Sequence, residues 1–290
     1  MTESRITAAT NHDQPWSPYG GAGLAPSVLL VLDHTAPSRA AVIRACRLSR
    51  LLDATLQIVD VVPVSAAHPA GTSVISRAAH LPGGERCDVE ITYGEVRESA
   101  ERAISRYRPV IVVMGAARGV ELACELVDRG RVTVIVARPE RTNGPFIAAS
   151  DLGHVGFPVV ARALELAERY ARELTLFHNA NAYPRLAGNP MEPPTRYASI
   201  SDLMEATVAA KVTRLRGIAG GHERVDAVIS RSQDTEASVL ELARERDADL
   251  VIVGRRAPSW LGRVLGHHLT EHLLERCQRS VMIVPVAAAA

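Results

Sequence analysis

An internal repeat constrains the fold of this chain more than any other feature of its sequence. Residues 28–62 align without a gap on residues 146–180, and Asp33 falls on Asp151. In each copy an aliphatic run ends at an acidic residue, a short turn follows, apolar residues recur at helical spacing, and a second aliphatic run begins. The repeat predicts two copies of one strand–helix–strand unit. The other matched pairs are Arg44 and Arg162, Ala45 and Ala163, Leu48 and Leu166, and Leu56 and Leu174.

The two copies differ in length at two places. The strand that ends at Gly115 matches the strand that ends at Gly254, so the offset between the copies grows from 118 to 139 residues. The 21 additional residues fall in segment 183–221, which holds a proline-rich loop at 183–197 and a helix over about 199–217. After the fourth strand the first copy is nine residues shorter than the second. We therefore expect the first copy to lack the loop in which a ligand would bind.

The last stretch of the chain, residues 249–285, reads as one more strand–helix–strand unit. It predicts a strand at 250–253, a turn opened by Gly254, a polar loop, a helix at about 268–277 and a strand at 281–284. In parallel units of this kind, ligands bind where the loop leaves the carboxyl end of the first strand. The loop after Gly254 is therefore where we expect function.

Shorter elements complete each copy. The pattern predicts third strands at 89–91 and 225–229, helices at 96–106 and 235–246, and final strands at 133–136 and 281–284. The two final strands are candidate sheet edges through which the copies could pair.

Composition narrows the class of protein. Hydrophobic residues make up 47% of the chain and aromatic residues only 4%, which favours an aliphatic parallel sheet covered by helices. A net charge of +1 gives no electrostatic reason to expect nucleic acid or an anionic membrane as partner. No apolar run is long enough for a membrane span, and residues 1–26 resemble a disordered lead-in rather than a signal peptide. We expect a cytoplasmic protein.

With strands and helices placed, the chain resembles a tandem universal stress protein. The residues that carry the resemblance are VLDHTAPSRAA at 31–41, ASDLGHVGFPV at 149–159, DADLVIVG at 247–254 and LTEHLLERCQRSVMIVP at 269–285. The resemblance implies an α/β fold of two tandem five-stranded parallel-sheet domains, Rossmann-like and doubly wound, that pack as a pseudo-dimer. We place the domains at residues 27–140 and 145–286. Some members of this adenine-nucleotide-binding superfamily bind ATP.

Members that bind a nucleotide carry, after the fourth strand, Gly, two residues, Gly, nine residues, and then Gly with Ser or Thr. Glycines let the backbone approach the phosphates, and a helix N-terminus attracts the anion. Laid on this chain without a gap, the motif falls on Gly254, Ala257, His267 and His268, so one position of four agrees. A one-residue deletion would place Gly266 at the third glycine and His267 at the hydroxyl position.

ATP is therefore a possible ligand of the second domain rather than an established one. The resemblance would place Asp151 near the adenine or ribose, and Val253, Gly254 and Gly266 near the phosphates. Asp33 and Gly115 would be the vestigial counterparts in the first domain. An Asp at the end of a strand also serves as a helix N-cap or turn former, and the sequence does not separate the two roles.

Three other groups of residues are weaker candidates. His267, His268 and His272 could bind a metal, but a solvated helix start explains them better and no ligand set is complete. His34 and Ser38 lack a third catalytic member, so we assign no catalytic residue. The loop arginines could bind phosphate or an acidic partner, although solvated side chains are the commoner case. They are Arg255, Arg256 and Arg263.

These observations favour a non-catalytic binding or signalling module of the stress response over an enzyme. We expect pairing of the two domains within the chain, a possible homodimer and an unidentified protein partner. An ATP- or adenylate-binding stress sensor that uses the second domain is the first alternative. A slow nucleotide hydrolase is the second, although no general base, metal-ligand set or intact phosphate loop can be assembled from the sequence.

Overall fold

The computed structural model describes most of both copies of the repeat. The described residues are 26–33, 39–62, 87–116, 119–150, 152, 158–180, 200–256 and 269–286. The first half contains β1 (Ser27–Asp33), α1 (Arg39–Leu51), β2 (Thr55–Val62), β3 (Cys87–Tyr93), α3 (Val96–Tyr107), β4 (Ile111–Gly115), α4 (Gly119–Gly130) and β5 (Thr133–Ala137). The second half contains β6 (Phe146–Ala149), α5 (Pro158–Tyr170), β7 (Leu174–Asn179), α6 (Ile200–Ala219), β8 (Val225–Ser230), α7 (Thr235–Glu245), β9 (Leu250–Arg256), α9 (Leu269–Arg276) and β10 (Ser280–Val286).

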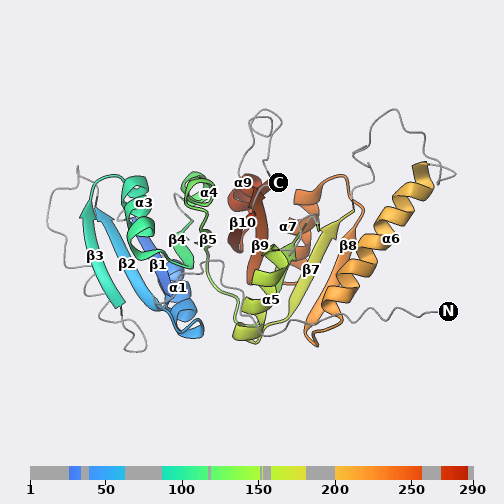
Figure 1. Ribbon diagram of the computed structural model, residues 1–290, viewed down its shortest axis with the longest axis horizontal. Helices are drawn as coiled ribbons and strands as arrows, with labels where there is room; N and C mark the ends of the chain where they lie inside the picture. Colours follow the sequence, from blue (N-terminus) through green and yellow to red (C-terminus); the bar gives the residue numbers. More distant parts are fainter. Residues whose placement is uncertain are drawn as a thin grey trace, which may run out of the picture.

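The strands form one ten-stranded sheet in the order β3-β2-β1-β4-β5-β10-β9-β6-β7-β8. Read outward from the middle, the two halves have the same order, and β3 and β8 lie at opposite ends (Figure 1). Neighbouring strands within each half are parallel, whereas β5 and β10 pair antiparallel with Ile135 opposite Met282. The predicted α/β fold with two doubly wound halves is confirmed. The pair that joins the halves consists of the two strands expected to be edges.

The sheet register reproduces the offsets of the repeat. Val28 of β1 lies opposite Ile111 of β4, and Phe146 of β6 lies opposite Leu250 of β9. The first members of these pairs are 118 residues apart and the second members 139. The alignment of the two copies is therefore the same in the sequence and in the sheet.

Most of the additional residues of the second half enter between its second and third strands. Leu56 lies opposite Cys87 in the first half, and Leu174 lies opposite Val225 in the second. These partners are separated by 31 and 51 residues, so 20 of the 21 extra residues precede β8. They include the expected helix, which the structure places at α6, while the proline-rich loop at 183–197 lies outside the described residues.

Two expectations at the end of the fourth strand are wrong. Gly115 lies opposite Ala137 and Gly254 lies opposite Val284, so the first half is eight residues shorter here, not nine. Gly254 also opens no turn, because β9 continues through it to Arg256. The reason is the neighbouring strand: β10 runs on to Val286 and supplies partners along the whole length of β9.

Helices cover both faces of the sheet. One core lies between the sheet and α1 and α5, and the other between the sheet and α3, α4, α7 and α9. Runs such as LVIV in β9 and VMIV in β10 are continuous and aliphatic because both faces of these strands are buried. At one end of the sheet α6 packs on β8 through the fully buried Leu215 (Figure 1). Within the described residues, no helix is long and apolar enough to cross a membrane.

Gly144 lies in the segment that links β5 to β6. A Cβ atom placed there would meet the carbonyl oxygen of Asp247 and lie 2.7 Å from the backbone nitrogen of Asp249. Backbone cannot swing aside as a side chain can, so Gly144→Ala is expected to lower the free energy of unfolding by more than about 1 kcal/mol. The measurement is denaturant unfolding.

Gly217→Ala is the matched control for this substitution. Gly217 lies on α6, and a Cβ atom there would meet nothing within 4 Å. Alanine stabilises a helix interior more than glycine does, so the free energy of unfolding of this variant is expected to rise by up to about 1 kcal/mol. Equal stability of the two variants would contradict the role assigned to Gly144.

Candidate functional site

The sheet places the candidate nucleotide site of the second half at a point where the strand order reverses. β6 lies between β7 and β9, and Ala149 near its end lies opposite Val253. In a doubly wound sheet this is the crevice in which ligands bind. The first half has the same arrangement, with Asp33 at the end of β1 and Gly115 at the end of the adjacent β4. The structure thus brings together the strand ends that the sequence singles out.

The turn after β6 is held by several hydrogen bonds. The Ser150 N–H donates to the carbonyl of Phe177 at 3.0 Å, and its hydroxyl oxygen accepts from the Leu152 N–H at 3.1 Å. The imidazole Nδ1 of His178 donates to the Ser150 carbonyl at 2.7 Å. Arg214 of α6 donates to the Leu152 carbonyl at 3.3 Å. The residues on both sides of Asp151 are therefore fixed from β7 and from the inserted helix.

Leu152 adopts a left-handed backbone conformation, with φ of 54°. This conformation is uncommon for a residue other than glycine, and it persists only where the surroundings hold it. Leu152 is held by the hydrogen bond that its N–H donates to Ser150 and by the one that Arg214 donates to its carbonyl, and His178 holds Ser150 in turn. Sequence reasoning missed His178 and Arg214, because neither lies in a motif and both act on backbone carbonyls.

Gly254 has a packing role within β9. A Cβ atom at this position would lie 2.8 Å from Cγ2 of Val159 on α5 and 2.9 Å from Cγ2 of Val286 on β10. Both distances are shorter than side chains tolerate, so only glycine lets the helix and the neighbouring strand close on β9. The glycine is thus explained by packing, without a phosphate ligand.

Arg255 is neither solvated nor available to a phosphate. Its guanidinium donates twice to the carboxylate of Asp128 on α4, at 2.8 Å each, and once to Glu271 on α9 at 3.1 Å. Its side chain is only 12% exposed. The hydrogen bonds that Arg255 donates to Asp128 raise the pKa of Arg255 and outweigh the effect of its burial, so the residue stays charged. This contact could not be predicted from the repeat, because the counterpart of Arg255 in the first copy is Ala116.

His272 also has a partner outside the predicted site. Its Nδ1 lies 2.8 Å from Glu236 on α7, and Arg276 donates to the other oxygen of that carboxylate at 2.9 Å. Burial alone would raise the pKa of Glu236, but the hydrogen bonds from Arg276 and His272 outweigh it and lower that pKa. Within the described part of the chain, no three His, Cys, Asp or Glu residues could hold a metal ion.

Several expected site residues lie outside the described residues, so the structure leaves their roles as predictions. They are His34, Ser38, Asp151, Ala257, Arg263, Gly266, His267 and His268, together with the side chain of Arg256.

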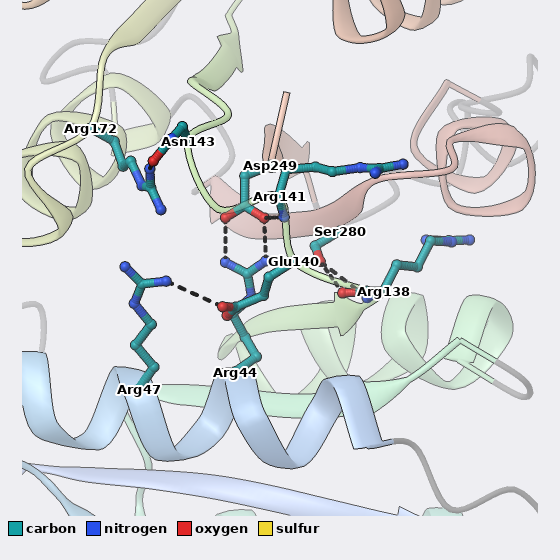
Figure 2. A network of polar contacts seen from close by, with 9 residues as sticks. All are labelled: Arg44, Arg47, Arg138, Glu140, Arg141, Asn143, Arg172, Asp249 and Ser280. Carbon is teal, nitrogen blue, oxygen red and sulfur yellow. Dashed lines mark hydrogen bonds and ion pairs between the residues drawn. The ribbon is translucent and has the colours of Figure 1, made fainter. Parts of the chain in front are cut away.

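Among the described residues, the two most buried charged side chains, Arg44 and Asp249, lie where the two halves meet (Figure 2). Arg44 of α1 is fully buried and donates to both oxygens of Asp249, at 2.8 and 2.9 Å. It also donates to the hydroxyl of Ser280, and its Nε lies 3.1 Å from Glu140. Burial alone would lower the pKa of Arg44, but the hydrogen bonds and charge of Asp249, with Glu140, outweigh it and raise that pKa.

This network is present on one side only of the repeat. Arg162, the counterpart of Arg44, pairs with its own helix neighbour Glu165 at 2.8 Å. The counterpart of Asp249 is Val110, as the backbone confirms. The Val110 N–H donates to the Ser27 carbonyl and the Asp249 N–H to the Pro145 carbonyl. Each of these pairs lies one residue before a matched pair of the sheet register, Val28–Ile111 and Phe146–Leu250. Arg44 therefore binds a carboxylate of the second half that has no counterpart in the first half.

The second half can be assigned to a family. Residues 146–285 match the family model described as the Universal stress protein family. They form a universal stress protein domain. The expected resemblance is thereby confirmed for the second half. The first half shares the strand order of this domain, and its membership of the same family remains a prediction.

Solved structures with this fold include two universal stress proteins. One, assigned to that family and from Pseudomonas aeruginosa UCBPP-PA14, has a TM-score of 0.68 at 13% identity, over 90% of this chain and 93% of that chain. The other, from Archaeoglobus fulgidus DSM 4304, has a TM-score of 0.64 at 12% identity, over 89% and 98%. A functionally unknown protein from Pseudomonas aeruginosa PAO1 has a TM-score of 0.65 at 13% identity, over 90% and 92%. None of the curated proteins compared with the chain matches it.

Breaking the buried pair of Arg44 and Asp249 should be costly. Arg44→Met leaves the Asp249 carboxylate buried without its cation, and we expect the free energy of unfolding to fall by about 3–5 kcal/mol. Arg162→Met makes the same change at the repeat counterpart, whose partner Glu165 is 36% exposed, and should cost less than about 1 kcal/mol. Denaturant unfolding compares the two variants. Similar decreases in the free energy of unfolding of both variants would contradict the prediction that the Arg44–Asp249 pair is the costlier one to break.

Buried thiols should make the protein sensitive to alkali. Burial raises the pKa of the Cys124 thiol on α4 from 9.0 to about 11. Between these values the unfolded chain loses a proton that the folded chain keeps, so the stabilisation present below pH 9 is lost as the pH rises towards 11. We expect a loss on the order of 2 kcal/mol from this group, measured by urea unfolding at several pH values. Cys124→Val should reduce the loss, and an unchanged pH dependence would contradict this assignment.

Proposed function

We propose that this protein is a non-catalytic binding or signalling module of the stress response, which acts through a protein partner rather than by turning over a nucleotide. The observation that carries the proposal is the state of Arg255. It follows Gly254, the first position of the phosphate motif, and two carboxylates already hold it. A cation bound in this way adds little attraction for a phosphate.

The charge at the start of α9 supports the same function. Glu271 lies in the first turn of this helix, where the helix dipole would otherwise attract an anion. Its carboxylate takes that place and also binds Arg255. Among the side chains that the structure describes here, Asp128 of the first half and Glu271 carry two negative charges against the one positive charge of Arg255. A triphosphate would meet repulsion there rather than a cradle.

The described cysteines and histidine near the candidate site are also poor candidates for a catalytic nucleophile or general base. Burial raises the pKa of the thiols of Cys124 and Cys277, which keeps both protonated at neutral pH. The ring nitrogen Nδ1 of His272 is engaged by the carboxylate of Glu236 at 2.8 Å. These features favour a binding module over the slow nucleotide hydrolase.

An adenylate-binding stress sensor is the second candidate. One observation favours it: Ser150 and Leu152, which flank Asp151, are held rigidly at the crevice between β6 and β9. A preorganised turn at this point is what binding of an adenine or ribose group would use. Adenylate without a triphosphate would avoid the carboxylates of Asp128 and Glu271.

Calorimetric titration of the full chain with ATP and Mg²⁺, and separately with AMP, tests the proposal. We expect no heat of binding from ATP and no release of inorganic phosphate. ATP or AMP binding with a micromolar Kd, lost in Asp151→Ala and kept in the control Glu223→Ala at an exposed position, would establish the sensor instead. Steady release of phosphate would establish the hydrolase.

A further inference from the structure

We propose that a groove between β3 and α3, in the first half of the chain, binds a small oxyanion such as a phosphate or carboxylate group. The groove has a volume of about 280 Å³. Val59 and Ala103 form its apolar floor, and Thr92 and Ser99 contribute hydroxyl groups. It lies at the end of the sheet away from the candidate nucleotide site of the second half, so it is a separate site (Figure 1).

Arg102 is the residue that would hold the anion. Its guanidinium makes two long hydrogen bonds, at 3.4 Å to the Glu98 carbonyl and at 3.3 Å to the Ser99 hydroxyl. Both acceptors are neutral, and Arg102 forms no ion pair with any carboxylate among the described residues. An oxyanion accepts two strong, charge-assisted hydrogen bonds from a guanidinium, so it would replace these contacts favourably.

The one carboxylate in the groove is already neutralised. Glu90 accepts a hydrogen bond from the hydroxyl of Tyr107 at 2.7 Å and pairs with Arg106 at 3.3 Å. Burial, followed by the hydrogen bond to Glu90, raises the pKa of Tyr107, so the phenol stays protonated and keeps donating. Arg102, Arg106 and Glu90 thus leave a net charge of +1 in the groove.

In the second half, the position that corresponds to this groove is filled by side chains. The register and the helix starts match Val59 with Phe177, Glu90 with Val228 and Ala103 with Leu242. Phe177 is 2% exposed and Leu242 8%, and Val228 packs on the same core. Large apolar side chains therefore fill the position that small or polar residues leave open in the first half.

The charges are reversed between the halves as well. Arg102 and Arg106 correspond to Glu241 and Glu245. Thr92 and Ser99 correspond to Ser230 and Ser238, whose hydroxyls lie 3.4 Å apart between β8 and α7. The fold is the same in both halves, so it does not require an open and basic groove. We assign the difference to ligand binding by the first half.

The test is an NMR titration of the ¹⁵N-labelled full chain. Sodium phosphate and sodium acetate are added in separate experiments, each against sodium chloride at equal ionic strength to remove screening effects. The amide signals of Thr92, Ser99 and Ala103 are expected to shift and to saturate, and the tighter of the two anions identifies the ligand class.

Two variants locate the binding and one serves as the control. Arg102→Gln should weaken binding at least tenfold, and Ala103→Leu should do the same by filling the groove as Leu242 does. Arg129→Gln removes an equal charge from an exposed position on α4 and should leave the affinity within twofold. No saturable shift with either anion, or equal affinity in the parent and in Arg102→Gln, would overturn the proposal.

Discussion

A short antiparallel ladder between β5 and β10 makes one sheet from two. Three residues on each strand pair, with Ile135 opposite Met282, and every other neighbouring pair of strands is parallel. Neighbouring parallel strands within one half are joined by crossover connections, most of which contain a helix. The antiparallel ladder joins two strands from different halves, and no crossover connection is needed between them. The ladder buries two strands that would otherwise be exposed edges. It also fixes how close the helices and side chains of the two halves come to each other.

Ion pairs on both faces of the sheet also hold the two halves in one orientation. Arg44 comes from α1, in one helical layer, and is held by Asp249. Arg255 comes from β9 and binds Asp128 of α4, in the other layer. Buried ion pairs gain little stability over apolar packing, but a broken pair is costly, so they oppose alternative arrangements. The same contacts that orient the halves also occupy the arginine nearest the phosphate motif.

The sequence predicted the topology because strands and helices repeat at measurable offsets. It could not predict that Gly254 lies within a strand, because that depends on how far β10 extends beside it. Nor could it predict the partner of Arg255, since Asp128 is 127 residues away and belongs to the other half. Pattern and spacing describe each copy alone, whereas these contacts arise between the copies. The roles assigned to residues 257–268 remain predictions, because these residues lie outside the described part of the chain.

The one-sided position of Arg44 has a consequence during synthesis. Two first halves from neighbouring ribosomes would have to pair with Arg44 facing Val110, which offers no carboxylate. Each Arg44 would keep Glu140 of its own half but would lose both hydrogen bonds to the Asp249 carboxylate. A first half that has emerged alone would therefore gain less from joining another first half than from joining a second half. The asymmetry of this contact favours pairing of a first half with a second half, which the same polypeptide supplies.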